Sequence, residues 1–295
     1  MTSATDIWQV GIVERAIGDV LNDGLDGAEI IWLPEAGSFR FNADPFGLWH
    51  NGCLTVLVEA YDYRSKHGEI HYHTFDPDWN LTAQGVALRE PFHLSYPQTI
   101  RDGGHIYLLP EGHRGDKLVL YRAVRFPDMW LPVATLLESP VIDASVVWHS
   151  GRWWMFHALA GEDQRAMREL HVAYADTLAG PWHPHAGNPV REALDSARPG
   201  GTPFVHRGVL YLPTQDCTRT YGGGLTLLRI EELTPDRFRA SPVRQFMPDV
   251  HPLYRDGLHT LSAAGDVTLI DVKRLDRSSR LWIDLERRWR RLVRK

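Results

Sequence analysis

The chain is poor in cysteine and contains no long hydrophobic run. Its two cysteines, Cys53 and Cys217, lie far apart and outside any metal-ligand spacing, which excludes a disulfide framework and a structural zinc site. No segment approaches the length of apolar sequence that a membrane-spanning helix needs. The first residues lack a basic stretch followed by an apolar run, so we expect no signal peptide and a cytoplasmic location.

Outside residues 277–295 acidic side chains outnumber basic ones. That segment holds eight basic and two acidic side chains, although the whole chain has a formal net charge of −5. The remaining residues are therefore strongly acidic, which argues against nucleic acid as a partner. Glycine-rich motifs of the Walker or Rossmann type are also absent, so we expect no organic cofactor.

Aromatic residues, in contrast, are plentiful. They make up 11% of the chain and include 11 tryptophans. Most of these rings are expected to pack in the core, and the others are suited to the apolar C–H face of a sugar.

A unit of about fifty residues recurs five times along the chain. Each unit has a short strand, a glycine-containing turn and a second apolar strand that ends near a polar residue. Such turns between β-rich segments are typical of hairpins, and further strands follow most of them. The five hairpins cover residues 43–59, 95–111, 142–157, 200–216 and 258–271.

Five such units predict an all-β fold, a five-bladed β-propeller with a short C-terminal amphipathic helix. A β-sandwich is the rival interpretation, but it would not need five similar hairpins with polar residues at matched positions. We expect the strand at residues 7–13 to pair with the last blade and close the ring. The propeller is assigned to residues 1–276 and a basic amphipathic helix to residues 277–295. Its apolar residues recur at helical spacing: Leu281, Trp282, Leu285, Trp289 and Leu292.

Propeller geometry is expected to bring polar residues to one mouth of the central channel. The first strand of each blade follows the channel and the second runs back beside it, so the start of one and the end of the other share a face. The residues at these positions are Asp44, Glu59, Tyr96, Glu111, Asp143, His157, Gln215, Asp216 and His259. Neighbouring carboxylates raise one another's pKa, which separates a base from an acid. They also suit a divalent cation, although the sequence identifies none.

Each of these residues also has a plain structural interpretation. A single carboxylate is most often a solvated turn residue or a partner of nearby backbone, and His259 is equally suited to be a satisfied core histidine. The matched repeat positions of Asp44 and Asp143 favour a functional interpretation for these two residues.

Two sets of motifs resemble known families. The segments Ala43-Asp44-Pro45-Phe46 and Ile142-Asp143-Ala144 resemble the signatures of blades one and three in the five-bladed glycosidase clan of arabinanases, β-xylosidases and fructosidases. More specifically, the chain is similar to the N-terminal propeller domain of glucosamine inositolphosphorylceramide transferases and their bacterial relatives. Segments 90–97, 197–201, 215–223 and 259–263 carry this second resemblance.

The glycosidase resemblance implies that Asp44 is the base or nucleophile and that Asp143 orients the reacting groups and tunes their pKa values. The general acid of that clan, a glutamate at the start of blade four, is missing, because Gly201-Thr202-Pro203 stands there. Its loss costs roughly 10² to 10⁴ in rate when the leaving group is a poor alkoxide, whereas phosphate leaves unaided. We therefore favour an inverting glycosyltransferase with a sugar-phosphate donor, pentofuranosyl by analogy with the clan. Arg198 and Arg219 are predicted to hold the phosphate.

The residues leave two alternatives open, a glycoside hydrolase with Asp44 as base and Glu111 as replacement acid, and a non-catalytic carbohydrate-binding propeller. In each case the partner is a sugar or a sugar phosphate, and a transferase also needs a lipid-linked or polysaccharide acceptor. The basic helix is suited to peripheral contact with the inner surface of an anionic membrane. A helix packed on the propeller or on a dimer partner is the competing interpretation.

Overall fold

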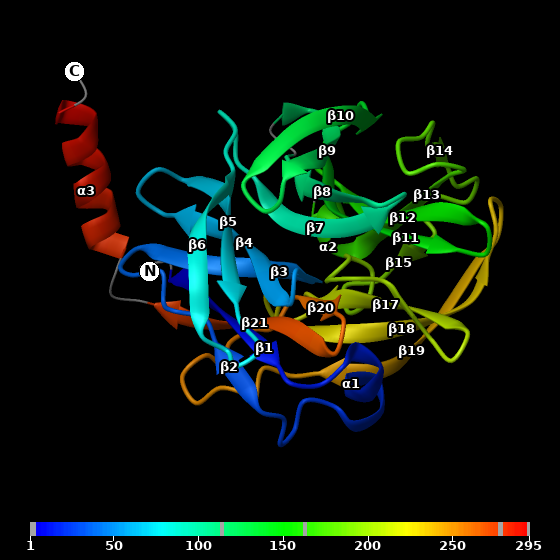
Figure 1. Ribbon diagram of the computed structural model, residues 1–295, viewed down its shortest axis with the longest axis horizontal. Helices are drawn as coiled ribbons and strands as arrows, with labels where there is room; N and C mark the ends of the chain where they lie inside the picture. Colours follow the sequence, from blue (N-terminus) through cyan, green and yellow to red (C-terminus); the bar gives the residue numbers. More distant parts are fainter. Residues whose placement is uncertain (1–3, 113–114, 162–163, 277–279, 294–295) are drawn as a thin grey trace.

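The computed structural model describes residues 4–112, 115–161, 164–276 and 280–293, with only part of the side chains in the last range. Five antiparallel sheets stand around a central axis, so the predicted five-bladed β-propeller is confirmed (Figure 1). Within each blade the strand order follows the chain outward from the centre, with the last blade as the exception.

The first four blades are built from consecutive strands. Blade one contains β3 (Arg40–His50), β4 (Cys53–Asp62), β5 (His67–Phe75) and β6 (Leu81–Leu88). Blade two contains β7 (Ser95–Asp102), β8 (His105–Glu111), β9 (Leu118–Arg125) and β10 (Met129–Leu137). Blade three contains β11 (Val141–His149), β12 (Arg152–Leu159), β13 (Glu169–Ala175), β14 (His183–Pro184) and β15 (Arg191–Glu192), with the short helix α2 (Arg165–Arg168) before β13. Blade four contains β16 (Phe204–His206), β17 (Val209–Asp216), β18 (Gly224–Leu233) and β19 (Phe238–Phe246).

Blade five joins the beginning of the propeller to its end. Its inner strands are β20 (Leu261–Ala264) and β21 (Val267–Asp276), and its outer strands are β1 (Thr5–Val13) and β2 (Ile30–Trp32). β1 pairs with β21 over its whole length, with Thr5 opposite Asp276 and Val13 opposite Thr268. The predicted closure by the strand at residues 7–13 is therefore confirmed. β2 and the helix α1 (Ile17–Asp23) have no counterpart in the sequence prediction.

The hydrophobic core lies between neighbouring blades. Between blades five and one, Val10 and Leu269 pack with Leu54 and Val56, and four further clusters fill the other junctions. A second strand such as β4 is covered by a neighbouring blade on each face. This explains why residues 54–58 form an almost continuous apolar run instead of alternating with polar residues.

The first strands depart from regular pairing at equivalent positions. Asp44, Tyr96 and Asp143 have φ values of 50°, 45° and 51°, and the strand pairing shifts register beside each of them. Gly201 stands at the same place in blade four with φ of 134°. Non-glycine residues keep such a backbone only where the surroundings impose it. A bulge of this kind re-aims the side chain and removes the backbone N–H from the strand pairing.

Helix α3 (Arg280–Val293) lies beside blade one at the edge of the propeller (Figure 1), and its Ile283 is fully buried. Arg287 donates hydrogen bonds to the Tyr63 carbonyl, and Arg64 forms an ion pair of 3.5 Å with Glu286. The predicted C-terminal helix is thus confirmed, while residues 277–279 and 294–295 of the predicted segment lie outside the described residues. Among the helices that the structure describes, none has the length and apolar character needed to cross a bilayer.

Tyr96 connects three blades near the channel axis. Its side chain is fully buried, and its hydroxyl lies 2.8 Å from the Ser145 hydroxyl of blade three. The same oxygen accepts a hydrogen bond from the Gly201 N–H of blade four. The tyrosine predicted to bind substrate therefore lies inside the wall, where it fastens blade two to its two successors.

We expect Tyr96→Phe to lower the free energy of unfolding by about 1–3 kcal/mol, because the buried N–H of Gly201 loses its acceptor. Urea unfolding followed by circular dichroism measures the change. Tyr107→Phe on β8 is the matched control, because the Tyr107 hydroxyl forms no hydrogen bond with any residue that the structure describes. A loss of equal size in both variants would contradict the connecting role of Tyr96.

Candidate functional site

One end of the channel opens into a pocket of about 310 Å³. Five carboxylate residues line it, together with one arginine and two histidines: Asp6, Asp44, Glu59, Glu111, Asp143, Arg198, His93 and His259. Ser95 and five aromatic residues form the rest of its wall, the latter being Trp8, Phe41, Tyr61, Tyr63 and Tyr221. The volume is at the lower end of the roughly 300–1,000 Å³ found for small-molecule sites. This space suits a ligand about the size of a monosaccharide.

The predicted site residues fall into three groups. Six meet in the pocket: Asp44, Glu59, Glu111, Asp143, Arg198 and His259. Tyr96, His157 and Gln215 are buried outside the pocket lining. Asp216 ends β17 and Arg219 is exposed in the loop that follows, so neither lines the pocket. The roles assigned to all of these residues stay predictions.

Several residues in or near the pocket were not among the predicted site residues, among them Asp6, His93, Asp271, Tyr221 and Trp8. In the sequence repeat Asp271 follows the second apolar run of the fifth unit, as Glu59 and Glu111 follow theirs, so the same positional rule identifies it. Tyr221 lies inside the family-like segment 215–223. Trp8 lies on β1, outside every repeat, and no pattern in the sequence indicates it.

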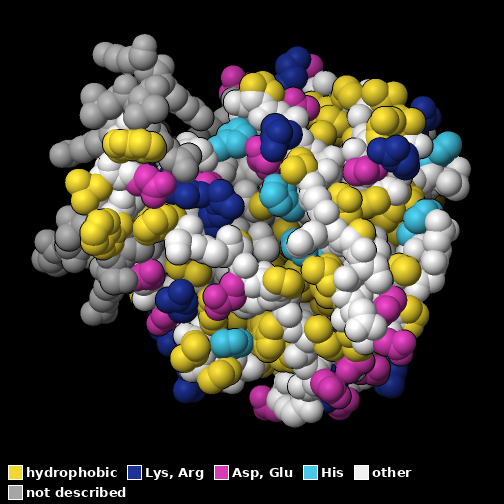
Figure 2. Space-filling model, turned by 60° about the vertical axis from the view of Figure 1, so that its left-hand side comes forward, with side chains coloured by type: hydrophobic (Ala, Val, Ile, Leu, Met, Phe, Trp, Pro, Cys, Tyr) yellow, Lys and Arg dark blue, Asp and Glu magenta, His cyan; other side chains and the backbone are white. Residues whose placement is uncertain are grey.

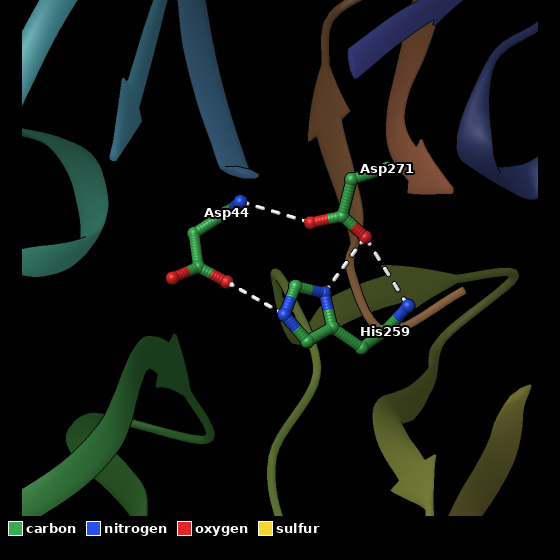
Figure 3. Close-up of side chains that lie close together, drawn as sticks. All are labelled: Asp44, His259 and Asp271. Atoms are coloured by element: carbon green, nitrogen blue, oxygen red, sulfur yellow. Dashed lines mark hydrogen bonds and ion pairs between the residues drawn. The ribbon is translucent and has the colours of Figure 1, made fainter. Parts of the chain in front are cut away.

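His259 is held between two carboxylates (Figure 3). Its Nδ1 lies 2.8 Å from the Oδ1 of Asp271, and its Nε2 lies 3.5 Å from the Oδ1 of Asp44. The imidazole also stacks on Trp8, with ring centroids 3.7 Å apart. Burial lowers the pKa of His259, but the charges of Asp271 and Asp44 outweigh this effect and leave the pKa raised. The imidazole therefore has both a defined orientation and a tendency to carry a proton.

Asp271 is the buried anchor of this group. Its two oxygens accept hydrogen bonds from the backbone N–H groups of Asp44, His259 and Thr260 as well as contacting the His259 ring. Asp44, His259 and Asp271 are also the described residues whose ligand atoms lie close enough together to hold a metal ion. A cation there would have to replace bonds that Asp271 already accepts. The hydrogen bonds of Asp271 therefore favour a hydrogen-bonded Asp44–His259–Asp271 triad over a metal centre.

A buried ion pair also lines the pocket. The Nε of Arg198 lies 2.6 Å from the Oδ2 of Asp143, which also accepts a hydrogen bond of 2.8 Å from Gln215. The Arg198 guanidinium lies over the Tyr221 ring, 4.9 Å from its centroid. Its two terminal nitrogens form no hydrogen bond with any described residue. Arg198 is thus fixed at Nε and can donate hydrogen bonds at its end.

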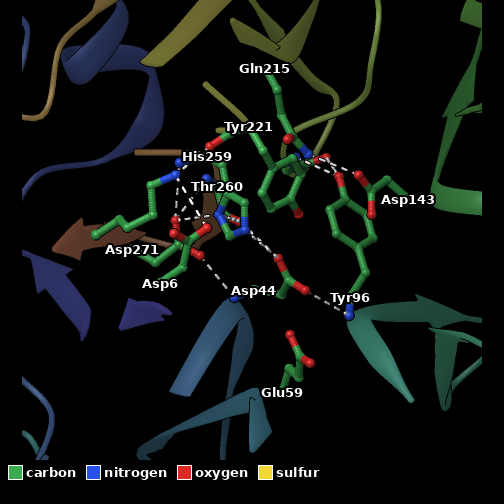
Figure 4. A network of polar contacts seen from close by, with 12 residues as sticks. Asp6, Asp44, Glu59, Tyr96, Asp143, Gln215, Tyr221, His259, Thr260 and Asp271 are labelled. Carbon is green, nitrogen blue, oxygen red and sulfur yellow. Dashed lines mark hydrogen bonds and ion pairs between the residues drawn. The ribbon is translucent and has the colours of Figure 1, made fainter. Parts of the chain in front are cut away.

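Burial also perturbs the carboxylates of the pocket (Figure 4). It raises the pKa of Asp44 to about 6; His259 opposes this shift, and Asp271 and Glu111 add to it. Burial likewise raises the pKa of Glu59 well above its usual range, with a further contribution from Asp44. The pKa of Asp143 is raised by burial, against the opposing charge of Arg198. A carboxylate that titrates near neutral pH is suited to general-base chemistry.

Packing explains the missing acid of blade four. Gly201 pairs with Leu261 of blade five, and a Cβ at Gly201 would lie 2.0 Å from the Leu261 carbonyl oxygen. Its φ of 134° is also one that L-residues rarely adopt. No side chain fits at this position, and Arg198 and Tyr221 supply blade four's part of the pocket wall.

The sequence matches the family model described as "Glucosamine inositolphosphorylceramide transferase 1, N-terminal" over residues 33–260. It is 36% identical over 218 residues to Glucosamine inositolphosphorylceramide transferase 1 of Oryza sativa subsp. indica, which covers 71% of this chain and 29% of that protein. The Arabidopsis thaliana protein of the same name is 32% identical over 204 residues, which covers 68% of this chain and 27% of that protein. The chain therefore spans less than a third of the length of these curated relatives.

Similar solved structures are propeller glycosidases. A GH43 β-xylosidase/α-arabinofuranosidase from a compost microbial metagenome aligns with a TM-score of 0.57 at 13% identity, over 83% of this chain and 92% of its own. The catalytic domain of the Coprinopsis cinerea GH62 α-L-arabinofuranosidase aligns with a TM-score of 0.61 at 10% identity, over 81% and 93% of the two chains. At such low identity the similarity concerns the fold alone.

We expect the effect of Asp44→Asn on stability to depend on pH. The pKa of Asp44 rises from 3.8 to about 6 on folding, so between these values the folded state keeps a proton that the unfolded chain has released. Ionisation of Asp44 therefore lowers the stability of the wild type as pH rises through this window, by about 3 kcal/mol in total. Asparagine does not ionise. Relative to wild type, the variant should thus be more stable at pH 8 than at pH 4.5 in urea unfolding, and a pH-independent difference would contradict the raised pKa.

Proposed function

The chain belongs to the family of glucosamine inositolphosphorylceramide transferase 1 N-terminal domains, and on this premise we propose that its pocket transfers a sugar from a phosphorylated donor to a hydroxyl acceptor. The observation that carries the proposal is the free end of Arg198, which lines the same pocket as Asp44. A base and a cation in one small cavity meet the two needs of this reaction. Because the match covers 29% of the rice relative, the assignment of activity to the propeller is itself part of the proposal.

Asp44 is the proposed base. It takes the proton of the acceptor hydroxyl while the acceptor oxygen forms a bond to the anomeric carbon of the donor. The bond from that carbon to the phosphate oxygen breaks, and its electron pair leaves with the phosphate. Attack opposite the leaving group inverts the anomeric centre. The protonated His259, oriented by Asp271, favours the ionised form of Asp44 that this step requires.

Arg198 is the proposed ligand of the departing phosphate. Asp143 and Tyr221 fix its orientation, and a guanidinium presents its planar donors in a geometry that matches phosphate oxygens. The phosphate leaves without protonation, so this reaction needs no acid at the position of Gly201. The sequence also predicts that Arg219 binds the phosphate. Its side chain is exposed outside the pocket, so the proposal assigns the phosphate to Arg198.

The donor sugar is proposed from the charge of the pocket and the name of the relatives. That name couples glucosamine with inositolphosphorylceramide. An amino sugar would bring a positive charge into a pocket that five carboxylate residues share with Arg198, His93 and His259. We therefore prefer a glucosamine phosphate over the pentofuranosyl donor that the glycosidase resemblance suggests.

Glycoside hydrolysis is the second candidate, and the position of Glu111 favours it. Glu111 lines the same pocket as Asp44 and contributes to its raised pKa. Its Oε2 accepts the backbone N–H of Asp143 at 3.1 Å, which holds the carboxyl group in place. In a hydrolase Glu111 would replace the missing acid, whereas a binding module would use the same pocket without turnover.

Calorimetric titration with glucosamine 1-phosphate and with methyl glucosaminide tests the proposed donor. We expect Arg198→Gln to weaken the affinity for glucosamine 1-phosphate by about 10- to 150-fold. This factor corresponds to the loss of charge-assisted hydrogen bonds that contribute about 1.5–3 kcal/mol. Affinity for the methyl glycoside, which has no phosphate, should stay within about twofold of wild type.

Arg219→Gln is the matched control, and it also tests the second predicted phosphate ligand. Because Arg219 is exposed outside the pocket, its loss should leave both affinities unchanged. Binding of the methyl glycoside alone, indifferent to Arg198, would overturn the transferase proposal. Release of methanol from that glycoside by wild type but not by Asp44→Asn would then identify a hydrolase.

We also propose an anionic lipid surface as the partner of α3. Trp282, Leu285 and Trp289 are 67%, 56% and 62% exposed, and their spacing places them along one side of the helix. Hydrophobic side chains are visible on this projecting element in Figure 2. The surrounding segment holds eight basic and two acidic residues, which complements anionic headgroups. α3 contacts Tyr63 of the pocket wall, so a lipid-linked acceptor would be presented near the pocket.

Vesicle sedimentation tests this membrane contact. We expect the wild type to sediment with phosphatidylcholine vesicles that contain phosphatidylserine, and the Trp282→Ser, Leu285→Ser, Trp289→Ser triple variant to stay in solution. The matched control replaces three exposed apolar residues of blade two, Val124→Ser, Met129→Ser and Leu131→Ser, and should sediment normally. Equal sedimentation of both triple variants would exclude α3 as the membrane-binding element.

A further inference from the structure

A second cavity, of about 590 Å³, lies over blade one. We call it the blade-one groove. Its residues include His67, Glu69, His71 and His73 along β5, Gln84 on β6, and residues 34–36 of the connection after β2. Figure 2 brings this side of the molecule forward and shows histidines interspersed with acidic and basic side chains. Phe41 and Tyr61 line both the groove and the channel pocket.

The arginines of the groove are already paired with carboxylates. Arg40 lies 3.2 Å from Asp62, and Arg89 forms two hydrogen bonds of 2.6 and 2.9 Å with Glu69. The lining therefore offers no unpaired guanidinium for an anion, and these two carboxylates are not available to a cation. The third carboxylate of the lining, Glu35, accepts a hydrogen bond of 3.2 Å from the Tyr254 hydroxyl. The remaining polar groups set its specificity.

Two of those remaining groups are neutral and form no hydrogen bond within the part of the chain that the structure describes. Asn42 is 8% exposed as a residue, and its side-chain amide, which keeps some contact with solvent, forms no hydrogen bond with any residue that the structure describes. His73 is 6% exposed and its Nδ1 likewise has no partner among those residues. Burial, with a further contribution from His71, lowers the pKa of His73 to about 4, so its ring is neutral at physiological pH. Buried polar groups are normally satisfied, and a ligand rich in hydroxyl groups would supply both donors and acceptors.

Aromatic rings stand where the groove meets the channel pocket. Phe41 and Tyr61 stack with ring centroids 5.1 Å apart. Aromatic rings with a few convergent polar groups are typical of small-molecule sites, and the apolar C–H face of a sugar packs on such rings. A saccharide in the groove would thus end beside a ligand in the channel pocket.

We propose that the blade-one groove binds a neutral saccharide and that this saccharide is the sugar portion of the acceptor. The role as acceptor site rests on the proposed transferase function. Saccharide binding itself does not, since it follows from the paired arginines, the unpartnered Asn42 and His73, and the two stacked rings.

Titration of the full chain with maltose, cellobiose and xylobiose tests the groove. At least one disaccharide should bind to the wild type, and Ala36→Trp should weaken that binding by at least about tenfold because the indole fills the groove. Ala83→Trp is the matched control, since Ala83 is exposed on β6 and does not line the groove. Asn42→Leu, which removes the unpartnered amide at similar volume, should weaken binding independently.

The outcomes separate this proposal from the proposed function. Ala36→Trp should leave the affinity for glucosamine 1-phosphate unchanged, because Ala36 does not line the channel pocket. Failure of every disaccharide to bind, or binding that is indifferent to both Ala36→Trp and Asn42→Leu, would overturn the groove site. Disaccharide binding that is lost only in Arg198→Gln would place the sugar in the channel pocket and also overturn it. Groove binding without any phosphate binding would remove the transferase proposal and leave the saccharide site standing.

Discussion

The left-handed bulge at the start of the first strands determines which side chains the channel must contain. At Asp44, Tyr96 and Asp143 the bulge takes the backbone N–H out of the strand pairing, and a buried N–H needs an acceptor. Asp271 accepts the N–H of Asp44, Asp44 accepts that of Tyr96, and Glu111 accepts that of Asp143. Each carboxylate reaches from one blade to the next. Two of them, Asp44 and Glu111, also line the pocket, so the groups that join the blades are partly the groups available for chemistry.

Hydroxyl or amide groups could accept the same backbone N–H groups without placing negative charges close together. At the junction with blade four the Tyr96 hydroxyl does so. The carboxylates elsewhere raise one another's pKa, and Arg198 and His259 only partly offset their burial. Ionisable groups kept in such an arrangement are characteristic of functional sites, where stability is exchanged for reactivity. The packing of Gly201 against Leu261 limits that reactivity, because it excludes an acid from blade four.

The repeat predicted the fold and the convergence at the channel, because hairpin ends determine where the backbone of each blade meets the mouth. It could not predict which way a side chain turns there. Tyr96 and Gln215 stand at the expected positions, yet they point into contacts with neighbouring blades. Arg219 depends on the conformation of a loop that no local pattern specifies. Trp8 reaches the pocket through the pairing of β1 with β21, a contact between distant parts of the chain that the repeat does not contain.

The shared construction of blade five makes the pocket depend on strands from both ends of the propeller. As the polypeptide leaves the ribosome, β1 is made first and its partner β21 comes more than two hundred and fifty residues later. Four blades can form during that interval, but Trp8, His259 and Asp271 cannot meet until the last strand has been added. A nascent or truncated chain that ends before residue 259 thus contains Asp44 without His259, whose positive charge favours the ionised form of Asp44. Closure of the ring thus makes formation of this pocket depend on synthesis of the whole propeller.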